Sequence, residues 1–162
     1  MRIFVPATSA DLSLPTPPTG VCFTAVTAPG ASSEEVEVAE FAAQTEAAVA
    51  SLELLQDAEF SADSGRSTLA KRRLVLAGDT SAVLGVSDPD TQVSQATVQS
   101  WTWEDVVALL VDGPSAEAAV NEVVNARSQE QADQALNDLW EYALEWFDVS
   151  ERTTLIADLA AD

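Results

Sequence analysis

One long segment with helical periodicity, from about Glu34 to Gln56, lies between two short β-rich runs of the chain. The first run spans Val21 to Thr27, and the second spans Arg72 to Gly78. A helix that connects two strands of one sheet usually makes a right-handed crossover between parallel strands. We therefore predict a parallel β-α-β unit here. The helix would pack on the sheet through an apolar face of Val38, Phe41, Thr45, Ala48, Val49, Leu52 and Leu55.

Other short apolar runs predict further strands. Arg2 to Val5 is typical of a buried strand, and Pro6 should end it because proline donates no hydrogen bond to a ladder. Val106 to Val111 is ambiguous between helix and strand; its β-branched residues and the Gly113-Pro114 turn after it favour a strand. The remaining candidates are a strand at Gln95 to Trp101 and a short edge strand at Ala82 to Val86.

The last third of the chain carries helical patterns. The expected helices run from Ser115 to about Ala126, from about Gln129 to Phe147, and from a cap at Ser150 onward. The fold class expected is α+β, in two layers: a mixed sheet of about five strands packed by about three to four helices, with a helical C-terminal part. Residues 1–148 should form a single domain of α/β type, and residues 149–162 a short C-terminal helix or tail.

The charge of the chain is strongly unbalanced. Its formal net charge is −20, with 27 acidic residues against seven basic ones, and Lys71 is the only lysine. Such a surface repels nucleic acids and anionic membranes. Three explanations remain open: solubility, adaptation to high salt, and a protein partner with a basic face.

The absence of histidine excludes several classes of site. Without it there is no Ser-His-Asp or Cys-His nucleophile and no histidine-based zinc or copper site. Cys22 is the only cysteine, so no disulfide can form within the chain. No phosphate-binding glycine loop and no EF-hand pattern occurs either. The opening residues do not form a signal peptide, and the longest apolar run, Val106 to Val111, is too short to span a membrane, so we expect a cytoplasmic location.

Parts of the sequence resemble a family of small actinobacterial proteins of unknown function. The opening residues 1–8, MRIFVPAT, carry the resemblance most specifically. Residues 72–79, RRLVLAGD, are similar to a central strand of that family, and residues 139–143, LWEYA, are similar to one of its helices. The proline-rich segment after Thr8 and the extension after Phe147 depart from the pattern. The resemblance implies a compact intracellular domain, and it implies no activity and no site residues.

Four aspartates are candidate ligands for a divalent cation. Asp79 and Asp112 each follow a predicted strand, and Asp88 and Asp90 flank Pro89 in the loop between them. Ligands gather beyond the carboxyl ends of strands in α/β sheets, and Mg²⁺ or Mn²⁺ prefers oxygen ligands. The alternative is that aspartate at these places is ordinary turn chemistry.

Two further sets of residues are candidate binding sites. Arg66, Lys71, Arg72 and Arg73 hold four of the seven basic residues and could bind an anion, or could pair with neighbouring acids. Leu155, Ile156 and Leu159 would lie on one side of the last helix, where they could dock on the domain or contact a partner. The aromatic side chains Trp101, Trp103, Trp140, Trp146 and Phe147 are expected in the core rather than in a ligand pocket.

These observations favour a non-enzymatic protein-interaction or regulatory module without a cofactor, whose acidic surface meets a basic protein partner. The alternative is an Mg²⁺- or Mn²⁺-dependent enzyme that acts on a phosphorylated small molecule through the clustered aspartates. The oligomeric state is left open by the sequence.

Overall fold

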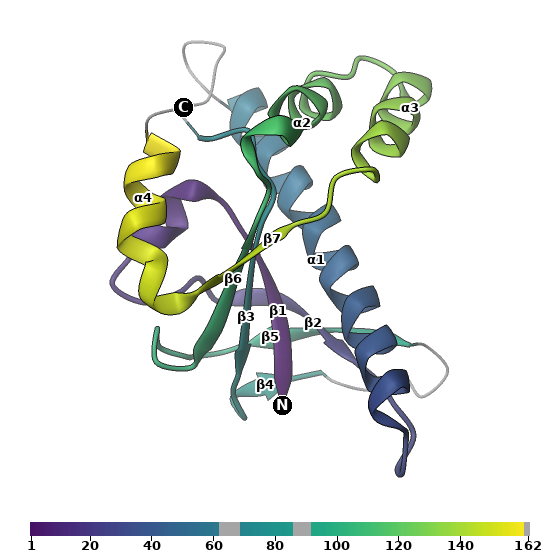
Figure 1. Cartoon of the computed structure of the whole chain (residues 1–162), viewed down its shortest axis with the longest axis vertical. Helices are drawn as coiled ribbons and strands as arrows, with labels where there is room; N and C mark the ends of the chain where they lie inside the picture. Colours follow the sequence, from purple (N-terminus) through teal and green to yellow (C-terminus); the bar gives the residue numbers. More distant parts are fainter. Residues whose placement is uncertain (62–68, 86–91, 161–162) are drawn as a thin grey trace.

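A single antiparallel sheet organises the molecule. The computed structural model describes residues 1–61, 69–85 and 92–160. Its seven-stranded sheet has the order β4-β5-β2-β1-β3-β6-β7, and every neighbouring pair is antiparallel (Figure 1). The strands are β1 (Arg2–Ala7), β2 (Gly20–Ala25), β3 (Leu74–Asp79), β4 (Val83–Leu84), β5 (Val93–Val98), β6 (Val106–Val111) and β7 (Glu145–Asp148).

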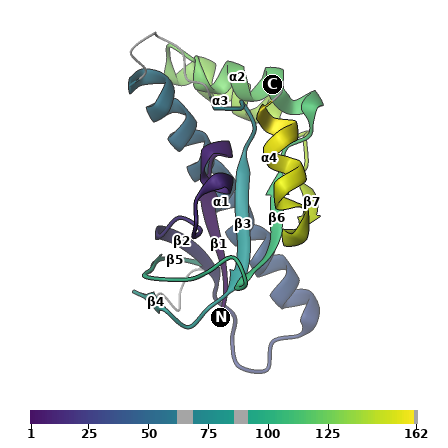
Figure 2. The same ribbon diagram turned by 90° about the vertical axis from the view of Figure 1, so that its left-hand side faces the viewer.

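Helices cover both faces of this sheet and one of its ends. Figures 1 and 2 show α1 on one face, α4 on the other, and the α2–α3 pair beside the C-terminal end of α1. The α-helices of the described residues are α1 (Ser33–Ser61), α2 (Glu117–Val124), α3 (Gln129–Leu139) and α4 (Arg152–Ala160). Three short 3-10 segments accompany them: η1 (Ser9–Ser13), η2 (Pro114–Ala116) and η3 (Val149–Glu151).

The predicted parallel crossover and the mixed sheet of five strands are wrong. α1 does connect β2 to β3, and these two strands run in the same direction because both are antiparallel to β1. They do not pair, however, because β1 is inserted between them. The prediction placed β2 and β3 side by side, whereas in the structure β1 separates them. Strand order depends on contacts between distant segments, which periodicity does not report.

Two segments extend the sheet beyond the expected strands. The helix predicted from Gln129 to Phe147 ends at Leu139, and residues 145–148 form β7 against β6. β1 continues through Pro6 to Ala7, although proline was expected to end it. The ladder between β1 and β2 registers only Phe4 with Phe23, so the β2 side of β1 makes few ladder bonds beyond that pair. A residue without an N–H is tolerated where ladder bonds are missing.

The central strand β3 is covered on both faces, as its continuous apolar run predicted. Leu74 and Leu76 pack with residues of η1, β6 and α4, whereas Val75 and Ala77 pack under α1. Gly78 permits a close approach at the end of this strand. A Cβ at this position would lie 2.5 Å from the Asp105 carbonyl oxygen and 2.8 Å from the Trp101 ring.

α1 contacts the sheet through alanine rather than through its larger apolar residues. A capping box between Ser32 and Glu35 starts the helix. Its buried residues are Ala39, Ala43, Ala47, Ala48, Ser51, Leu52 and Leu55. The predicted face is therefore correct for the second half of the helix and wrong for the first, where Val38 and Phe41 are exposed. In this first half the buried positions are Ala39 and Ala43 instead, so the helix faces the sheet with its small residues.

α4 packs on the opposite face of the sheet. Leu155 and Leu159 are each only 4% exposed and belong to the same core cluster as Ile3, Leu76 and Leu109. Arg152 lies 4.3 Å above the Trp103 ring. No helix of the described residues is long and apolar enough to cross a membrane.

Candidate binding groove

The two described candidate metal ligands lie at opposite ends of the same pair of strands. Asp79 ends β3, whereas Asp112 follows β6 and lies beside Arg73 at the start of β3. β3 and β6 are antiparallel, so the carboxyl ends of these strands point in opposite directions. Asp88 and Asp90 are outside the described residues. The described residues bring together no group of three or more potential ligands among Cys, Asp and Glu.

Asp112 is occupied by a buried ion pair. The Arg73 guanidinium donates to it at 2.8 Å and 2.7 Å, and the backbone N–H of Arg73 donates at 2.9 Å. The two side chains are 3% and 0% exposed. The same guanidinium also donates to the Tyr142 carbonyl oxygen at 2.8 Å. This pair therefore ties β3 and β6 to the segment that leads into β7.

The other candidate residues are also engaged within the fold. Arg2 pairs with Asp79 at 2.8 Å, and this guanidinium lowers the pKa of the Asp79 carboxyl. Lys71 contacts Glu59 at 2.5 Å, Arg72 is half-buried, and Arg66 is outside the described residues. Lys71 and Arg73, two positions apart in sequence, thus bind different acids, Glu59 and Asp112. Ile156 is half-buried beside the buried Leu155 and Leu159, so the last helix docks on its own domain.

Cys22 is buried in the same core cluster as α4. Burial raises the pKa of its thiol to about 11. The thiol therefore stays protonated near neutral pH, and it behaves as a small core side chain.

An exposed group of apolar side chains lies beside α1, on its side toward β7. α1 packs mainly over β2, β1, β3 and β5, and a gap that is lined by the buried Ala108 and Leu110 of β6 remains between α1 and β7. Four aromatic side chains border this gap. Phe41 on α1 is 66% exposed, Trp146 on β7 is 61% exposed, and Trp140 and Tyr142, in the segment after α3, are 46% and 37% exposed.

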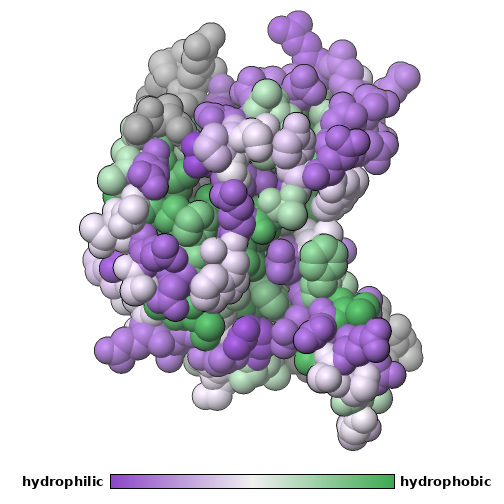
Figure 3. Space-filling view, in the orientation of Figure 1, coloured by the Kyte–Doolittle hydropathy of each residue, from purple (hydrophilic) through white to green (hydrophobic). Residues whose placement is uncertain are grey.

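These side chains line two adjoining hollows, which together we call the aromatic groove. One part, about 390 Å³, lies between α1 and residues 140–144, and the other, about 250 Å³, lies between α1 and Trp146. Phe41 and Gln44 line both parts. In Figure 3, hydrophobic side chains are exposed in the recess on the right, between the polar surface of α3 and the first turns of α1.

The floor and the wall of the aromatic groove differ in character. The floor consists of small and apolar residues of the sheet, namely Phe4, Ala77, Ala108 and Leu110. The wall on α1 carries the carboxylates of Glu37 and Glu40. The single cation of this part, Arg2, is already paired with Asp79. The groove thus combines an apolar floor, exposed aromatic rings and a negative rim.

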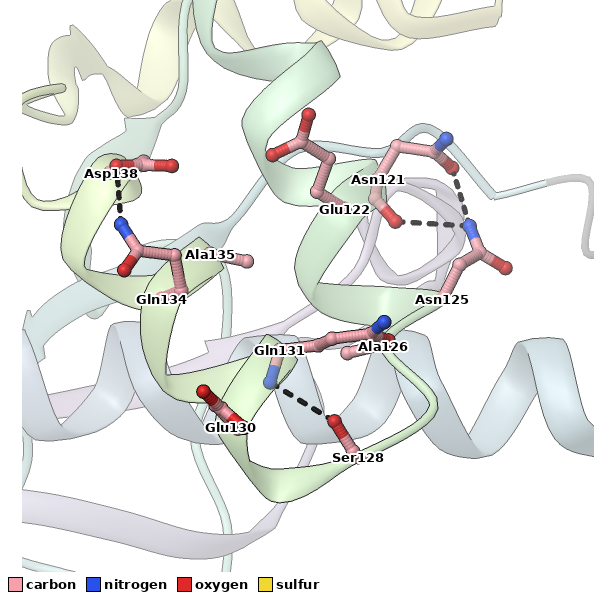
Figure 4. Close-up of a pocket in the computed structure, with 10 residues that line it drawn as sticks. All are labelled: Asn121, Glu122, Asn125, Ala126, Ser128, Glu130, Gln131, Gln134, Ala135 and Asp138. Carbon is pink, nitrogen blue, oxygen red and sulfur yellow. Dashed lines mark hydrogen bonds between the residues drawn. The ribbon is translucent and has the colours of Figure 1, made fainter.

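A second cleft lies between α2 and α3. It measures about 760 Å³ and is lined by polar side chains of both helices (Figure 4). Those side chains bond mainly within their own helix: Asn125 donates to Asn121 at 2.9 Å, and Gln134 donates to Asp138 at 3.4 Å. This cleft is larger than the aromatic groove, but its lining is polar, as on a solvated helix surface.

The sequence predicts that the tryptophan side chains lie in the core. For Trp101, which is 5% exposed and donates to the Pro18 carbonyl, that assignment is confirmed. For Trp140 and Trp146 it is wrong. The alternation of residues 145–148 contained the missing signal, because Phe147 and Trp146 fall on opposite faces of a strand. The alternation is informative only if this segment is a strand, and the sequence predicted a helix there.

Residues 1–156 match the model of a protein family described only as a family of unknown function, DUF6912. The chain therefore belongs to this family. No curated protein and no solved structure matches the chain.

Proposed function

We propose that this member of DUF6912 is a non-enzymatic interaction domain that binds a basic segment of another protein in the aromatic groove. The observation that carries the proposal is the exposure of Phe41, Trp140 and Trp146 around a groove with an apolar floor. Contiguous exposed apolar surface on a folded domain usually marks a binding site. Tryptophan and tyrosine are also the residues that most often dominate the binding energy of protein interfaces.

The charge of the chain favours a basic partner. The net charge is −20, and the carboxylates of Glu37 and Glu40 lie on the rim of the aromatic groove. Complementary charge accelerates the encounter with a basic partner and suppresses binding of acidic ones. Arginine and lysine side chains also stack favourably on exposed tryptophan rings. The proposal keeps the cytoplasmic location expected from the sequence.

The alternative of a divalent-cation enzyme has no comparable support. Asp79 and Asp112 point to opposite ends of the β3–β6 pair, and each forms an ion pair with an arginine. We therefore retain the interaction domain as the proposed function.

Selection from a display library of random twelve-residue peptides tests this proposal. The wild-type domain should enrich peptides with a net positive charge and at least one aromatic or β-branched residue. The substitutions Phe41→Ala and Trp146→Ala should each weaken binding of the selected peptides by at least about tenfold, because they remove exposed aromatic anchors. Both side chains are exposed, so the fold should tolerate their loss.

Phe60→Ala is the matched control. Phe60 lies on the same helix, is 95% exposed, and does not line the aromatic groove. This variant should bind the selected peptides as the wild type does. The proposal is overturned if no basic peptide is enriched, or if Phe60→Ala weakens binding as much as the two groove variants do.

A further inference from the structure

The outer edge of β7 borders the aromatic groove and ends the sheet. β7 pairs with β6 on one side, and no strand of the described residues pairs with its other side. The backbone of an edge strand presents unpaired N–H and C=O groups to any extended chain that approaches. Addition of a strand to such an edge is a recurring mode of peptide recognition.

The hydrogen bonds at the end of β7 show which backbone groups point outward. The N–H of Asp148 donates to the Glu151 carboxylate at 2.9 Å, so it does not bond to β6. Successive residues of a strand point their backbone groups to alternate sides. The N–H and C=O of Trp146, two residues earlier, therefore point to the outer edge, whereas those of Glu145 and Phe147 point to β6.

The side chains of β7 alternate between the two faces of the sheet. Trp146 is opposite Leu110 and Asp148 is opposite Ala108, so both lie on the face that carries the groove. Phe147 is opposite Leu109 and packs on the α4 side. A strand added beside β7 would thus place every second side chain next to Trp146 and Asp148.

Charge decides which strand fits this edge. Asp148 accepts a hydrogen bond from the Ser150 N–H, which lowers the pKa of its carboxyl, and Glu145 is exposed at the other end of β7. A second copy of the chain would bring the acids of two β7 strands, and two net charges of −20, against each other. Like charges across neighbouring strands are destabilising. A basic strand is the complementary occupant.

We propose that the basic partner segment binds as an extended strand that pairs with the outer edge of β7 and places cationic side chains on its groove face, beside Trp146 and Asp148. This inference rests on the proposed function and specifies how the partner is held. The backbone of Trp146 supplies the hydrogen bonds, and the Trp146 ring with the carboxylates of Glu37, Glu40 and Asp148 selects the charge.

Backbone methylation of the peptides selected from the library tests the inference. Each interior peptide nitrogen is N-methylated in turn, and the dissociation constant is measured with the wild-type domain. Methylation should weaken binding by about tenfold or more at the nitrogen whose N–H bonds to the Trp146 carbonyl, because that N–H faces β7. The nitrogens on either side of it face away from β7, and their methylation should change binding by less than about threefold.

Amide hydrogen exchange on the domain gives an independent readout. Addition of a saturating selected peptide should slow exchange of the Trp146 amide. The amides of Glu145 and Phe147, which already face β6, serve as internal controls and should change little. A methylation effect at one nitrogen and not at its two neighbours, together with protection at Trp146, supports strand addition.

The failure of the inference is distinct from failure of the proposed function. If a selected peptide binds, but methylation acts at every interior position or at none, the peptide binds as a helix or through side chains alone. The inference is then overturned while the interaction domain stands. If no basic peptide is selected at all, both fall together.

Discussion

Arg73 and Asp112 are separated by 39 positions in the chain, and they form the most completely buried ion pair of the described residues. Two charges without water are stable only when their hydrogen bonds are satisfied. Here the carboxylate accepts three hydrogen bonds from Arg73, and the guanidinium also donates to Tyr142. Asp112, a predicted ligand for a cation, and Arg73, a predicted ligand for an anion, thus bind each other. Their position connects the core to the segment that carries Trp140 and Tyr142.

Removal of one partner of this pair should be costly. We expect Asp112→Asn to lower the free energy of unfolding by about 3–5 kcal/mol, because it leaves the Arg73 charge buried without a counter-charge. Urea denaturation measures the change. The exposed pair of Arg2 and Asp79 is the control, and Asp79→Asn should cost less than about 1 kcal/mol. Equal costs for the two substitutions would contradict this reading of the buried pair.

α1 shows how one element can pack through its smallest side chains. Ala43, Ala47 and Ala48 lie against Phe4, Phe23 and Val75 of the sheet. The buried Ser51 hydroxyl donates to the Ala7 carbonyl at 2.8 Å and accepts from the Leu74 N–H at 3.0 Å. Small residues let the helix backbone approach the strands closely. This close approach also leaves the larger Phe41 at the side of the helix, where it borders the aromatic groove.

Enlargement of the alanine face should separate α1 from the sheet. We expect Ala47→Leu to destabilise the domain by about 1–3 kcal/mol, because a well-packed core does not accommodate extra methyl groups without strain. Ala47 is fully buried, whereas Val38 on the same helix is 55% exposed. Val38→Leu is therefore the matched control and should change stability by less than about 0.5 kcal/mol. Thermal or chemical denaturation distinguishes the two, and a neutral Ala47→Leu would contradict close packing of α1.

At the scale of the whole molecule, the dominant property is charge. A net charge of −20 on one small domain repels itself in the folded state more strongly than in the expanded chain. The same field favours approach of a basic partner to the aromatic groove. Stability and partner binding should therefore respond to salt in opposite directions.

Screening of this charge should stabilise the fold. Between about 10 mM and 1 M NaCl the screening length falls from about 30 Å to about 3 Å. We expect the melting temperature to rise by several degrees over this range, with about 2–4 °C for each kcal/mol gained. Over the same range the selected basic peptides should bind more weakly. A melting temperature that falls with salt would contradict the role assigned to self-repulsion.

Mg²⁺ or Mn²⁺ at matched ionic strength completes this experiment. A further rise above the NaCl control, lost in Asp79→Asn, would revive the metal hypothesis. A rise equal to the NaCl control would leave screening as the whole effect.

The sequence by itself determined the charge, the exclusion of histidine chemistry, and the approximate positions of β1, β2, β3, β6, α1 and α2. These properties depend on composition or on local periodicity, which each segment carries alone. Only the tertiary structure decided that β1 lies between β2 and β3, and that residues 145–148 form a strand. It also decided that Trp146 and Phe41 are exposed while Trp101 is buried. The physical reason is that both strand order and side-chain exposure depend on contacts between segments that lie far apart in the sequence. α1 reaches β3 and stops short of β7, and no local pattern in either segment records that limit.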